Sequence, residues 1–290
     1  MEFIKPPLKW VGGKTQIIDS LIQKFPKNIH NYHEIFLGGG SVLLAVLSSD
    51  IKINNNICAY DLNNELICLY IHIRDNPEKL IQKLEELKKE FNKIKGDVIN
   101  RKPSDIKEAM TSQESFYYWI RQEYNKIKNN NIKKSAMFVF LNKTCFRGMF
   151  REGPNGFNVP FGHYKNPSIY DKEHINKVSK LIQNVQFVHA DFTKSFKNIN
   201  NKDFVYLDPP YVPENKKSFV GYNKNGFNKH EELFTLTKNL KAKFIMSNSN
   251  TKLVNDSFEK YNVVEIDCRR AINSKKPQSK TKEVIISSID

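Results

Sequence analysis

The tetrapeptide Asp208-Pro209-Pro210-Tyr211 holds the residue types in this sequence that are best suited to chemistry. It follows the apolar run FVYL, which is typical of a buried strand. Two consecutive prolines cannot continue a sheet, because neither has an N–H to donate and each restricts the residue before it. An acid and an aromatic ring are therefore held rigidly at the end of a predicted core strand. Taken alone, the stretch fits a reactive carboxylate or a rigid turn capped by an aspartate.

A glycine turn and a second acid indicate a bound nucleoside. Gly38, Gly39 and Gly40, here called the glycine turn, follow another predicted strand and allow the backbone to approach a ligand closely. Asp61 ends the next predicted strand, 21 residues beyond Gly40, where a carboxylate can accept hydrogen bonds from both hydroxyls of a ribose. An isolated Asp61 would also fit a helix N-cap, but the two features together favour a nucleoside cofactor.

The first motif of the chain, LKWVGGK, holds Trp10, a Gly-Gly turn and Lys14. A cation after such a turn can bind a carboxylate or a phosphate. The continuation GGKT also occurs at the end of a P-loop, but Leu8 stands where that motif requires its first glycine. Nucleoside triphosphate binding is therefore excluded.

These residues require a sheet that brings the ends of several strands together. In the first and last parts of the chain, short apolar runs such as YHEIF, ICAYD, VQFVH and KFIMS alternate with helical patterns. This alternation predicts an α/β fold, a mostly parallel sheet of Rossmann-like type covered by helices.

The middle of the chain has a different, mainly helical pattern. In NPEKLIQKLEELKKEFNKI, Asn76 is a candidate N-cap and Pro77 fits the first helical position. One face of this predicted helix is apolar and consists of Leu80, Leu84, Leu87, Phe91 and Ile94. We predict an α/β domain formed by residues 1–70 and 167–290, interrupted by a helical insertion at residues 71–166.

Charge and cysteine usage limit the partners and the compartment. Lys and Arg number 46 against 31 Asp and Glu, a net charge of +15, which fits a polyanionic partner and equally a generically basic surface. The four cysteines are scattered without a CxxC pair, which favours a reducing compartment over disulfides or zinc. The apolar run at residues 42–47 is too short to cross a membrane, and the N-terminus has no apolar secretion signal. We expect an intracellular, cytoplasmic protein without a membrane partner.

Together, the motifs LKWVGGK, FLGGGS, YDLN and DPPY resemble the Dam family, the D12 or alpha class of S-adenosylmethionine-dependent DNA adenine-N6 methyltransferases. Their order is that of the family: cofactor motifs, then the target-recognition insertion, then DPPY. Residues 140–167, FLNKTCFRGMFREGPNGFNVPFGHYKNP, match the family's recognition segment almost block for block, and this name is kept for them below. The stretches FVGYNKNGF and CRRAINS also match, so the resemblance covers nearly the whole chain. It implies a class I methyltransferase sheet, S-adenosylmethionine as cofactor and double-stranded DNA as partner.

The resemblance also assigns roles to individual residues. The cofactor-binding positions are Trp10, Lys14, Phe36, Gly38, Gly40, Asp61 and Asp208. The catalytic positions are Asp208, Pro209 and Tyr211. The DNA-contacting positions are Phe146, Arg147, Met149, Arg151, Asn158, Pro160, His163 and Tyr164. The chain departs from the family pattern at Ile35, where proline is usual, and in its side chains at Arg147 and His163.

Two sets of basic residues are expected to contact DNA in different ways. Arg151 falls where the family places an arginine on a guanine edge, and bidentate contact to O6 and N7 would read that base; a phosphate contact is the alternative. The stretch RRAINSKKPQSKTK has no acid and is expected to contact the DNA backbone between two terminal strands; a solvated hairpin tip is the alternative. Its candidate residues are Arg269, Arg270, Lys275 and Lys276.

The reaction that the resemblance implies fits the DPPY residues. The lone pair of adenine N6 is delocalised into the ring, and the Asp208 carboxylate and Pro209 carbonyl can accept the two N6 hydrogens and localise it. Because this amine is paired inside a duplex, the adenine must be flipped out, and Tyr211 is suited to stack on it. We expect neither a metal nor a covalent enzyme intermediate. The resemblance suggests GATC as the target.

Several alternatives stay open. Another methyl acceptor is one of them: cytosine N4, an RNA adenine or a glutamine amide. Asp208 favours adenine, because cytosine-N4 enzymes tend to have Ser at that position and the glutamine enzymes Asn. A DNA-binding homologue without catalysis is another, against which the intact Asp208, Asp61 and Lys14 argue. The sequence also leaves open whether the protein acts with a partner restriction nuclease, and whether it is a monomer or a weak dimer.

Overall fold

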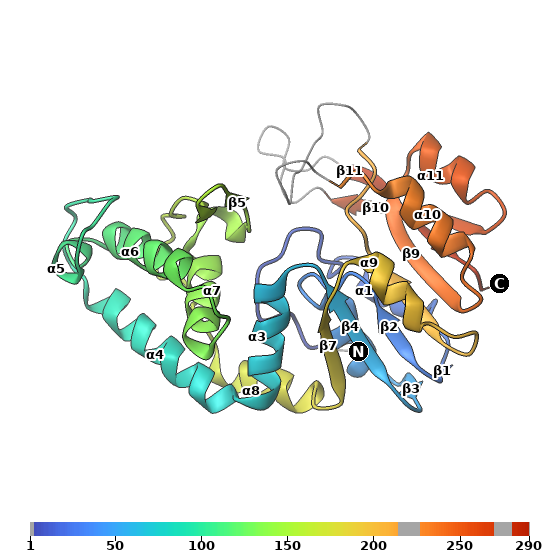
Figure 1. The fold of residues 1–290 in the computed structure, drawn as a ribbon, viewed down its shortest axis with the longest axis horizontal. Helices are drawn as coiled ribbons and strands as arrows, with labels where there is room; N and C mark the ends of the chain where they lie inside the picture. The colour runs from blue at the N-terminus through green and yellow to red at the C-terminus, as the bar shows by residue number, and fades with distance from the viewer. Residues whose placement is uncertain (1–2, 214–226, 270–279, 290) are drawn as a thin grey trace.

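The computed structural model describes residues 3–213, 227–269 and 280–289 (Figure 1). Its centre is a seven-stranded sheet with the order β10-β11-β9-β8-β2-β4-β7. The parallel part consists of β2 (Tyr32–Glu34), β4 (Ile57–Asp61), β7 (Val185–His189), β8 (Phe204–Leu207) and β9 (Lys243–Ser249). At one edge β11 (Lys280–Ser287) runs antiparallel to both β9 and β10 (Asn262–Arg269). The predicted Rossmann-like α/β fold is confirmed.

The sheet is apolar on both faces because helices cover both. On β8, Tyr206 belongs to one buried cluster, whereas Val205 and Leu207 belong to the other, as the alternation of side chains along a strand requires. One face is covered by α1 (Ile18–Ile22), α2 (Ser41–Leu47) and α3 (Asn64–Asp75). The other is covered by α9 (Phe192–Ser195), α10 (His230–Lys238) and α11 (Lys252–Ser257). Short elements complete this part: β1 (Asn28–Ile29) paired with β3 (Lys52–Ile53), and the 3₁₀ turn η2 (Phe196–Asn198).

The strand order reverses at β2. From β2 the chain proceeds outward to β4 and β7, and then returns to β8 on the opposite side of β2. In open α/β sheets ligands bind at the carboxyl ends of the strands beside such a reversal. The glycine turn after β2 and Asp208 after β8 therefore meet at the place where the fold offers a site.

A helical lobe lies between β4 and β7 in the sequence and to the left of the sheet in Figure 1. It contains α4 (Pro77–Lys93), α5 (Ile106–Ala109), α6 (Gln113–Lys126) and α7 (Ile132–Thr144), followed by the 3₁₀ turn η1 (Phe146–Gly148), the hairpin β5 (Glu152–Gly153) and β6 (Gly156–Phe157), and α8 (Lys172–Leu181). Helix α7 is buried along nearly its whole length because α3, α4 and α6 all pack against it. The division of the chain at residues 70 and 166 stays a prediction; α3 continues past the first of these positions.

Helix α4 follows the predicted pattern in part: of its predicted apolar face, Leu87 is half-buried and Ile94 lies just beyond the end of the helix. Leu80, Leu84 and Phe91 are buried, and Pro77 occupies the first position. Asn76 precedes the helix as predicted, but its side chain makes no capping hydrogen bond. None of the described helices is long and apolar enough to cross a membrane.

Candidate active site

The two motifs at opposite ends of the sequence meet in an ion pair. The Lys14 ammonium donates to Asp208 Oδ2 at 2.7 Å and to the carbonyl oxygen of Gly12 at 2.6 Å. Its side chain is 4% exposed and that of Asp208 is 19% exposed. The other carboxylate oxygen, Asp208 Oδ1, is buried and accepts no hydrogen bond in the described part of the protein. A buried acceptor without a donor is costly, so this atom is a point where a ligand donor would gain most.

Two opposing effects set the protonation of Asp208. Burial raises the pKa of its carboxyl to about 6, and the nearby Lys14 ammonium limits the rise, while Glu283 adds to it. Above that pH the carboxylate is ionised and can only accept hydrogen bonds. At neutral pH the site therefore presents a negatively charged acceptor inside the protein.

The turn after β8 is held by the two strands that follow it in the sheet. The Tyr211 hydroxyl donates to Glu283 Oε2 on β11 at 2.8 Å, and the Lys14 ammonium lies 5.0 Å from the centroid of the Tyr211 ring. On β9, Asn248 Oδ1 accepts from the Val212 N–H at 3.1 Å. These contacts add to the rigidity of the two prolines.

Glu283 and Asn248 are absent from the residues that the sequence predicted for the site. The available signal was a polar residue next to an apolar strand core, in KEVII for Glu283 and IMSNS for Asn248. Such a signal does not show which strand end the polar side chain lies beside in the sheet. The strand register decides it, because Glu283 is paired with Ser249 and Val284 with Asn248.

The glycine turn is attached to Asp61 through the backbone. Gly38 donates its N–H to Asp61 Oδ2 at 2.8 Å, and Asn63 donates to Oδ1 at 2.8 Å. Burial raises the pKa of Asp61, and these N–H donors oppose the rise. Each carboxylate oxygen retains a second lone pair that can accept from a ligand. Asp61 thus connects the turn after β2 to the beginning of α3, which Asn63 caps by accepting from Leu66 N.

Close packing around the glycine turn makes its residue types necessary. Gly38 and Gly40 have φ values of +51° and +73°, which residues with a Cβ rarely adopt. A Cβ on Gly39 would lie 2.7 Å from Trp10 Cβ. Trp10 in turn stacks on Phe150, with ring centroids 5.8 Å apart. Predicted cofactor residues of the first and second motifs are thereby in direct contact.

Phe36, the remaining predicted cofactor residue, belongs to a separate aromatic group. Its ring packs against Phe192 at 5.9 Å and Phe227 at 6.3 Å between centroids. It adjoins the glycine turn in sequence but packs with the cluster on the α10 side of the sheet.

A third acid, which sequence analysis missed, lies beneath the site. Glu34 at the end of β2 is buried and accepts a hydrogen bond from the Tyr32 hydroxyl at 2.7 Å. Burial raises its pKa to about 8, and the charges of Asp208 and Asp61 contribute to the rise. Within YHEIF it resembled an ordinary strand residue, and only the sheet brings it near the other two acids.

In the recognition segment, the end of α7 and the loop after it dock on the first motif. Arg147 has a φ of +56° and is followed by Gly148 at +64°. The buried Asn142 amide donates to the carbonyl oxygens of Lys9 at 2.8 Å and Gly148 at 3.0 Å, and its Oδ1 accepts from Lys9 N at 2.9 Å. Phe146, 45% exposed, projects from this loop, whereas Met149 is half-buried.

The hairpin of the recognition segment pairs two predicted DNA contacts. Arg151 Nε donates to Asn158 Oδ1 at 2.6 Å, and both residues are exposed. The Pro160 carbonyl accepts from Phe146 N at 2.9 Å, which joins the two ends of the segment. The Tyr164 ring centroid lies 4.3 Å from the Lys9 ammonium.

His163 stands apart from this group, with its ring 3.8 Å from a Glu114 oxygen on α6. Of the predicted basic loop, Arg269 ends β10, whereas Arg270, Lys275 and Lys276 lie outside the described residues.

Comparison with known proteins decides the family. The sequence profile of the D12 class N6 adenine-specific DNA methyltransferases matches residues 10–272. The chain belongs to this family. The matched residues include both halves of the α/β sheet, the helical lobe and the recognition segment.

Curated relatives of this D12 methyltransferase carry corresponding names. It is 35% identical to the type II methyltransferase M.MjaIII of Methanocaldococcus jannaschii over 94% of each chain. It is 30% identical to the type II methyltransferase M1.LlaDCHI of Lactococcus lactis over 98% of this chain and 95% of that one. A DNA adenine methylase of Haemophilus influenzae is 27% identical over 96% of this chain and 91% of the relative.

Family membership confirms an enzyme that methylates adenine N6 in DNA, as the motifs predicted. It also separates the chain from the cytosine-N4 and glutamine enzymes that the sequence motifs left open.

Proposed function

We propose that this D12 methyltransferase transfers a methyl group from S-adenosylmethionine to N6 of an adenine flipped out of double-stranded DNA, within the sequence GATC. The observation that carries the proposal is the buried Asp208 Oδ1 at the carboxyl end of β8, which has no hydrogen-bond partner among the described residues. Such an atom needs a donor, and an adenine amine supplies two N–H groups.

Asp208 and Pro209 act on the amine. Asp208 Oδ1 accepts one N6 hydrogen and the Pro209 carbonyl accepts the other, which localises the nitrogen lone pair. The Asp208 charge stabilises the positive charge that develops on the amine during transfer. Lys14, bonded to Oδ2, keeps the carboxylate ionised at neutral pH and leaves Oδ1 for the substrate.

The chain has residues that fit the proposed cofactor. S-adenosylmethionine, when bound, supplies a methyl group on a positively charged sulfur. The glycine turn has no side chain to obstruct a nucleoside, and Asp61 retains lone pairs for ribose hydroxyls. Trp10, Lys14 and Phe36 border this region as further cofactor contacts.

Base flipping and sequence choice involve Tyr211 and the recognition segment. The Tyr211 hydroxyl is occupied by Glu283, which orients the ring for stacking on an extruded adenine. Arg151, oriented by Asn158, would read the guanine of GATC. GATC itself rests on the resemblance of residues 140–167 to the family's recognition segment.

Sequencing of DNA methylated by the purified enzyme, read for the context of N6-methyladenine, tests this proposal. We expect methylation confined to GATC. Methylated adenines in another context would overturn the choice of GATC but leave the reaction intact. DNA binding without transfer of labelled methyl groups from S-adenosylmethionine to any duplex would overturn the reaction.

A further inference from the structure

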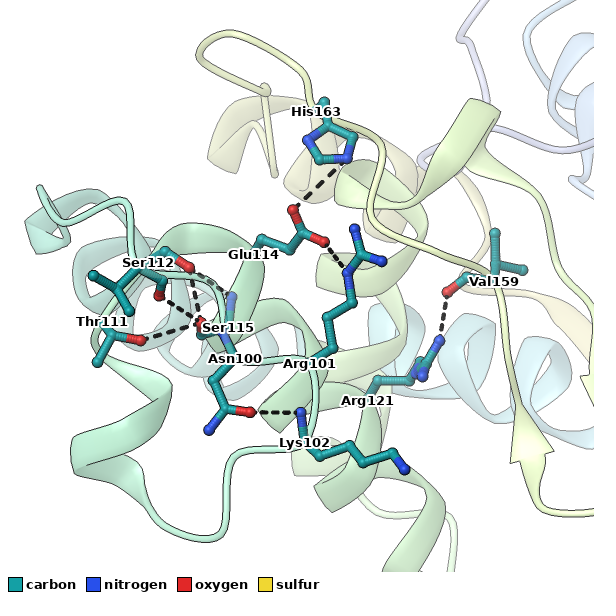
Figure 2. Close-up of polar contacts among 11 residues, drawn as sticks. Asn100, Arg101, Lys102, Thr111, Ser112, Glu114, Ser115, Arg121, Val159 and His163 are labelled. Atoms are coloured by element: carbon teal, nitrogen blue, oxygen red, sulfur yellow. Dashed lines mark hydrogen bonds and ion pairs between the residues drawn. The ribbon is translucent and has the colours of Figure 1, made fainter.

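An acid, an arginine and a histidine from separate segments meet at the end of the helical lobe (Figure 2). Glu114 lies in the first turn of α6, Arg101 in the loop before α5, and His163 near the end of the recognition segment. Arg101 Nε donates to Glu114 Oε1 at 2.8 Å, and His163 Nε2 lies 3.8 Å from Glu114 Oε2. The two carboxylate oxygens therefore face two different groups, a guanidinium and an imidazole.

Glu114 is buried, whereas its two partners are exposed to solvent. The Glu114 side chain is 5% exposed, whereas Arg101 is 65% and His163 66% exposed. A buried carboxylate is costly unless it is paired, so Glu114 holds both partners at fixed places while their outer atoms face solvent. Within the described residues, Arg101 donates only through Nε, and its two Nη groups donate no hydrogen bond to the protein. These groups are the donors that bind phosphate in a bidentate manner.

The loop that carries Arg101 is anchored before any partner arrives. Asn100 donates its N–H to Ser115 Oγ at 2.7 Å, and its Oδ1 accepts from Lys102 N at 2.9 Å (Figure 2). Ser104 N donates to Glu108 Oε2 at 2.8 Å. A side chain on a preordered loop loses less entropy when it binds.

The recognition segment is fastened to the same helix. The carbonyl oxygen of Val159 accepts from the Tyr117 hydroxyl at 2.7 Å and from Arg121 at 3.1 Å, both on α6. His163, with a φ of +51°, packs its ring against Phe161 at 5.0 Å. Arg101 is thus held at a fixed place beside the recognition segment, which we propose to bind DNA. In the sequence, α5 and α6 lie between them.

We propose that Arg101 is a further DNA contact, which together with His163 binds a phosphate of the duplex backbone beside the recognition site, and that Glu114 is the residue that positions both. The inference rests on the proposed function, because it requires the recognition segment to bind duplex DNA. The net charge of +15 fits such a polyanionic partner.

The test is the salt dependence of duplex binding by the full chain carrying Arg101→Gln. The slope of log K against log salt is negative, and loss of one phosphate contact should make it less steep by about 0.9. Binding to specific and nonspecific duplexes should weaken equally. The matched control is Lys52→Gln, which removes one charge from an exposed residue of β3 and should leave the slope unchanged. An equal change in both variants, or no change with Arg101→Gln, would overturn the proposal, as would a loss confined to the specific duplex.

A second variant separates positioning from charge. Glu114→Gln makes the surface more positive, so a purely electrostatic effect would tighten DNA binding. Positioning predicts the opposite: weaker binding, and no additional loss when Glu114→Gln is combined with Arg101→Gln. Tighter binding by Glu114→Gln would refute its assigned role.

Neutral methylphosphonate substitutions, placed one at a time along the duplex, locate the contact. One position should weaken the wild type and have no effect on Arg101→Gln; sensitivity at the same positions in both proteins would contradict the assignment. These are binding measurements, so they distinguish this inference from the proposed reaction. Normal methylation with unaltered salt dependence in Arg101→Gln would overturn the inference alone, and absence of methylation with an Arg101-dependent slope would overturn the reaction alone.

Discussion

The active site and the recognition segment are held by different kinds of contact. Lys14 and Asp208 are largely buried and are joined across 194 positions of sequence, and Asp61 connects two strand ends through backbone N–H groups. Arg151 and His163 are exposed, and their contacts come from their own hairpin or from the helix beneath. The reaction centre therefore depends on the whole sheet, whereas the exposed side chains of Arg151 and His163 can be exchanged without disturbing the buried ion pair. The departures from the family pattern at Arg147 and His163 fall in the second region.

Removal of the reactive carboxylate should give the largest effect of any single change. Asp208→Ala deletes the acceptor and the negative charge, so methyl transfer should fall by at least about 10³-fold. DNA binding should be largely retained, because the recognition segment lies outside the buried site. Labelled-methyl transfer and duplex titration measure the two properties, with the exposed Asp50→Ala as control. Unaltered turnover would disprove the assigned role of Asp208.

Loss of the guanine reader should affect recognition and leave the buried site intact. Arg151→Ala should cost about 1–3 kcal/mol in binding and relax the sequence preference at the guanine. Competition between cognate duplexes and duplexes altered at that base measures it. Uniform weakening on all sequences would instead identify a phosphate contact and remove the distinction that we draw for Arg151.

Protonation of Asp208 gives the buried site a pH dependence. Transfer should fall as pH drops through about 6, because the protonated carboxyl no longer accepts through both oxygens. Lys14→Gln removes the cation that limits the pKa, so the acidic limb should move to higher pH and cost about tenfold in rate near pH 6. Rate profiles at saturating cofactor measure the limb. An identical limb in both proteins would show that Lys14 does not tune Asp208.

Substitution of Asn142, which joins the first motif to the recognition segment, should have the smallest effect of these changes. Asn142→Ala removes the amide that joins Lys9 to Gly148. Lys9 is exposed and can gain water in exchange, but the buried Gly148 carbonyl loses its donor, so the free energy of unfolding should fall by about 1–2 kcal/mol. Chemical denaturation measures that loss, and binding to cognate duplex should weaken as the loop loses its support. A loss of cognate binding with full stability retained would place Asn142 at the DNA instead.

Local patterns in the sequence were sufficient for several of the elements that position the candidate site. The strand before DPPY, the glycine turn and the apolar face of α4 lie where predicted, because prolines, glycines and helical periodicity act over a few residues. The cap at Asn76 was only half predicted. Its position is correct, but its side chain bonds no helical N–H, a detail that depends on its φ and ψ of −142° and 47°.

The sequence by itself determined the motifs, the basic charge and the order of cofactor, recognition and catalytic segments. The tertiary structure decided which residues contact these motifs. Lys14 pairs with Asp208, and Glu283 accepts a hydrogen bond from Tyr211. Glu34 lies near Asp61 and Asp208, and Glu114 lies between Arg101 and His163. These pairings join segments far apart in the chain or depend on strand register, and neither is encoded in a local pattern. Burial then raises the pKa of Asp208 and of Glu34, because desolvation depends on everything packed around the carboxylate and not on its sequence neighbours.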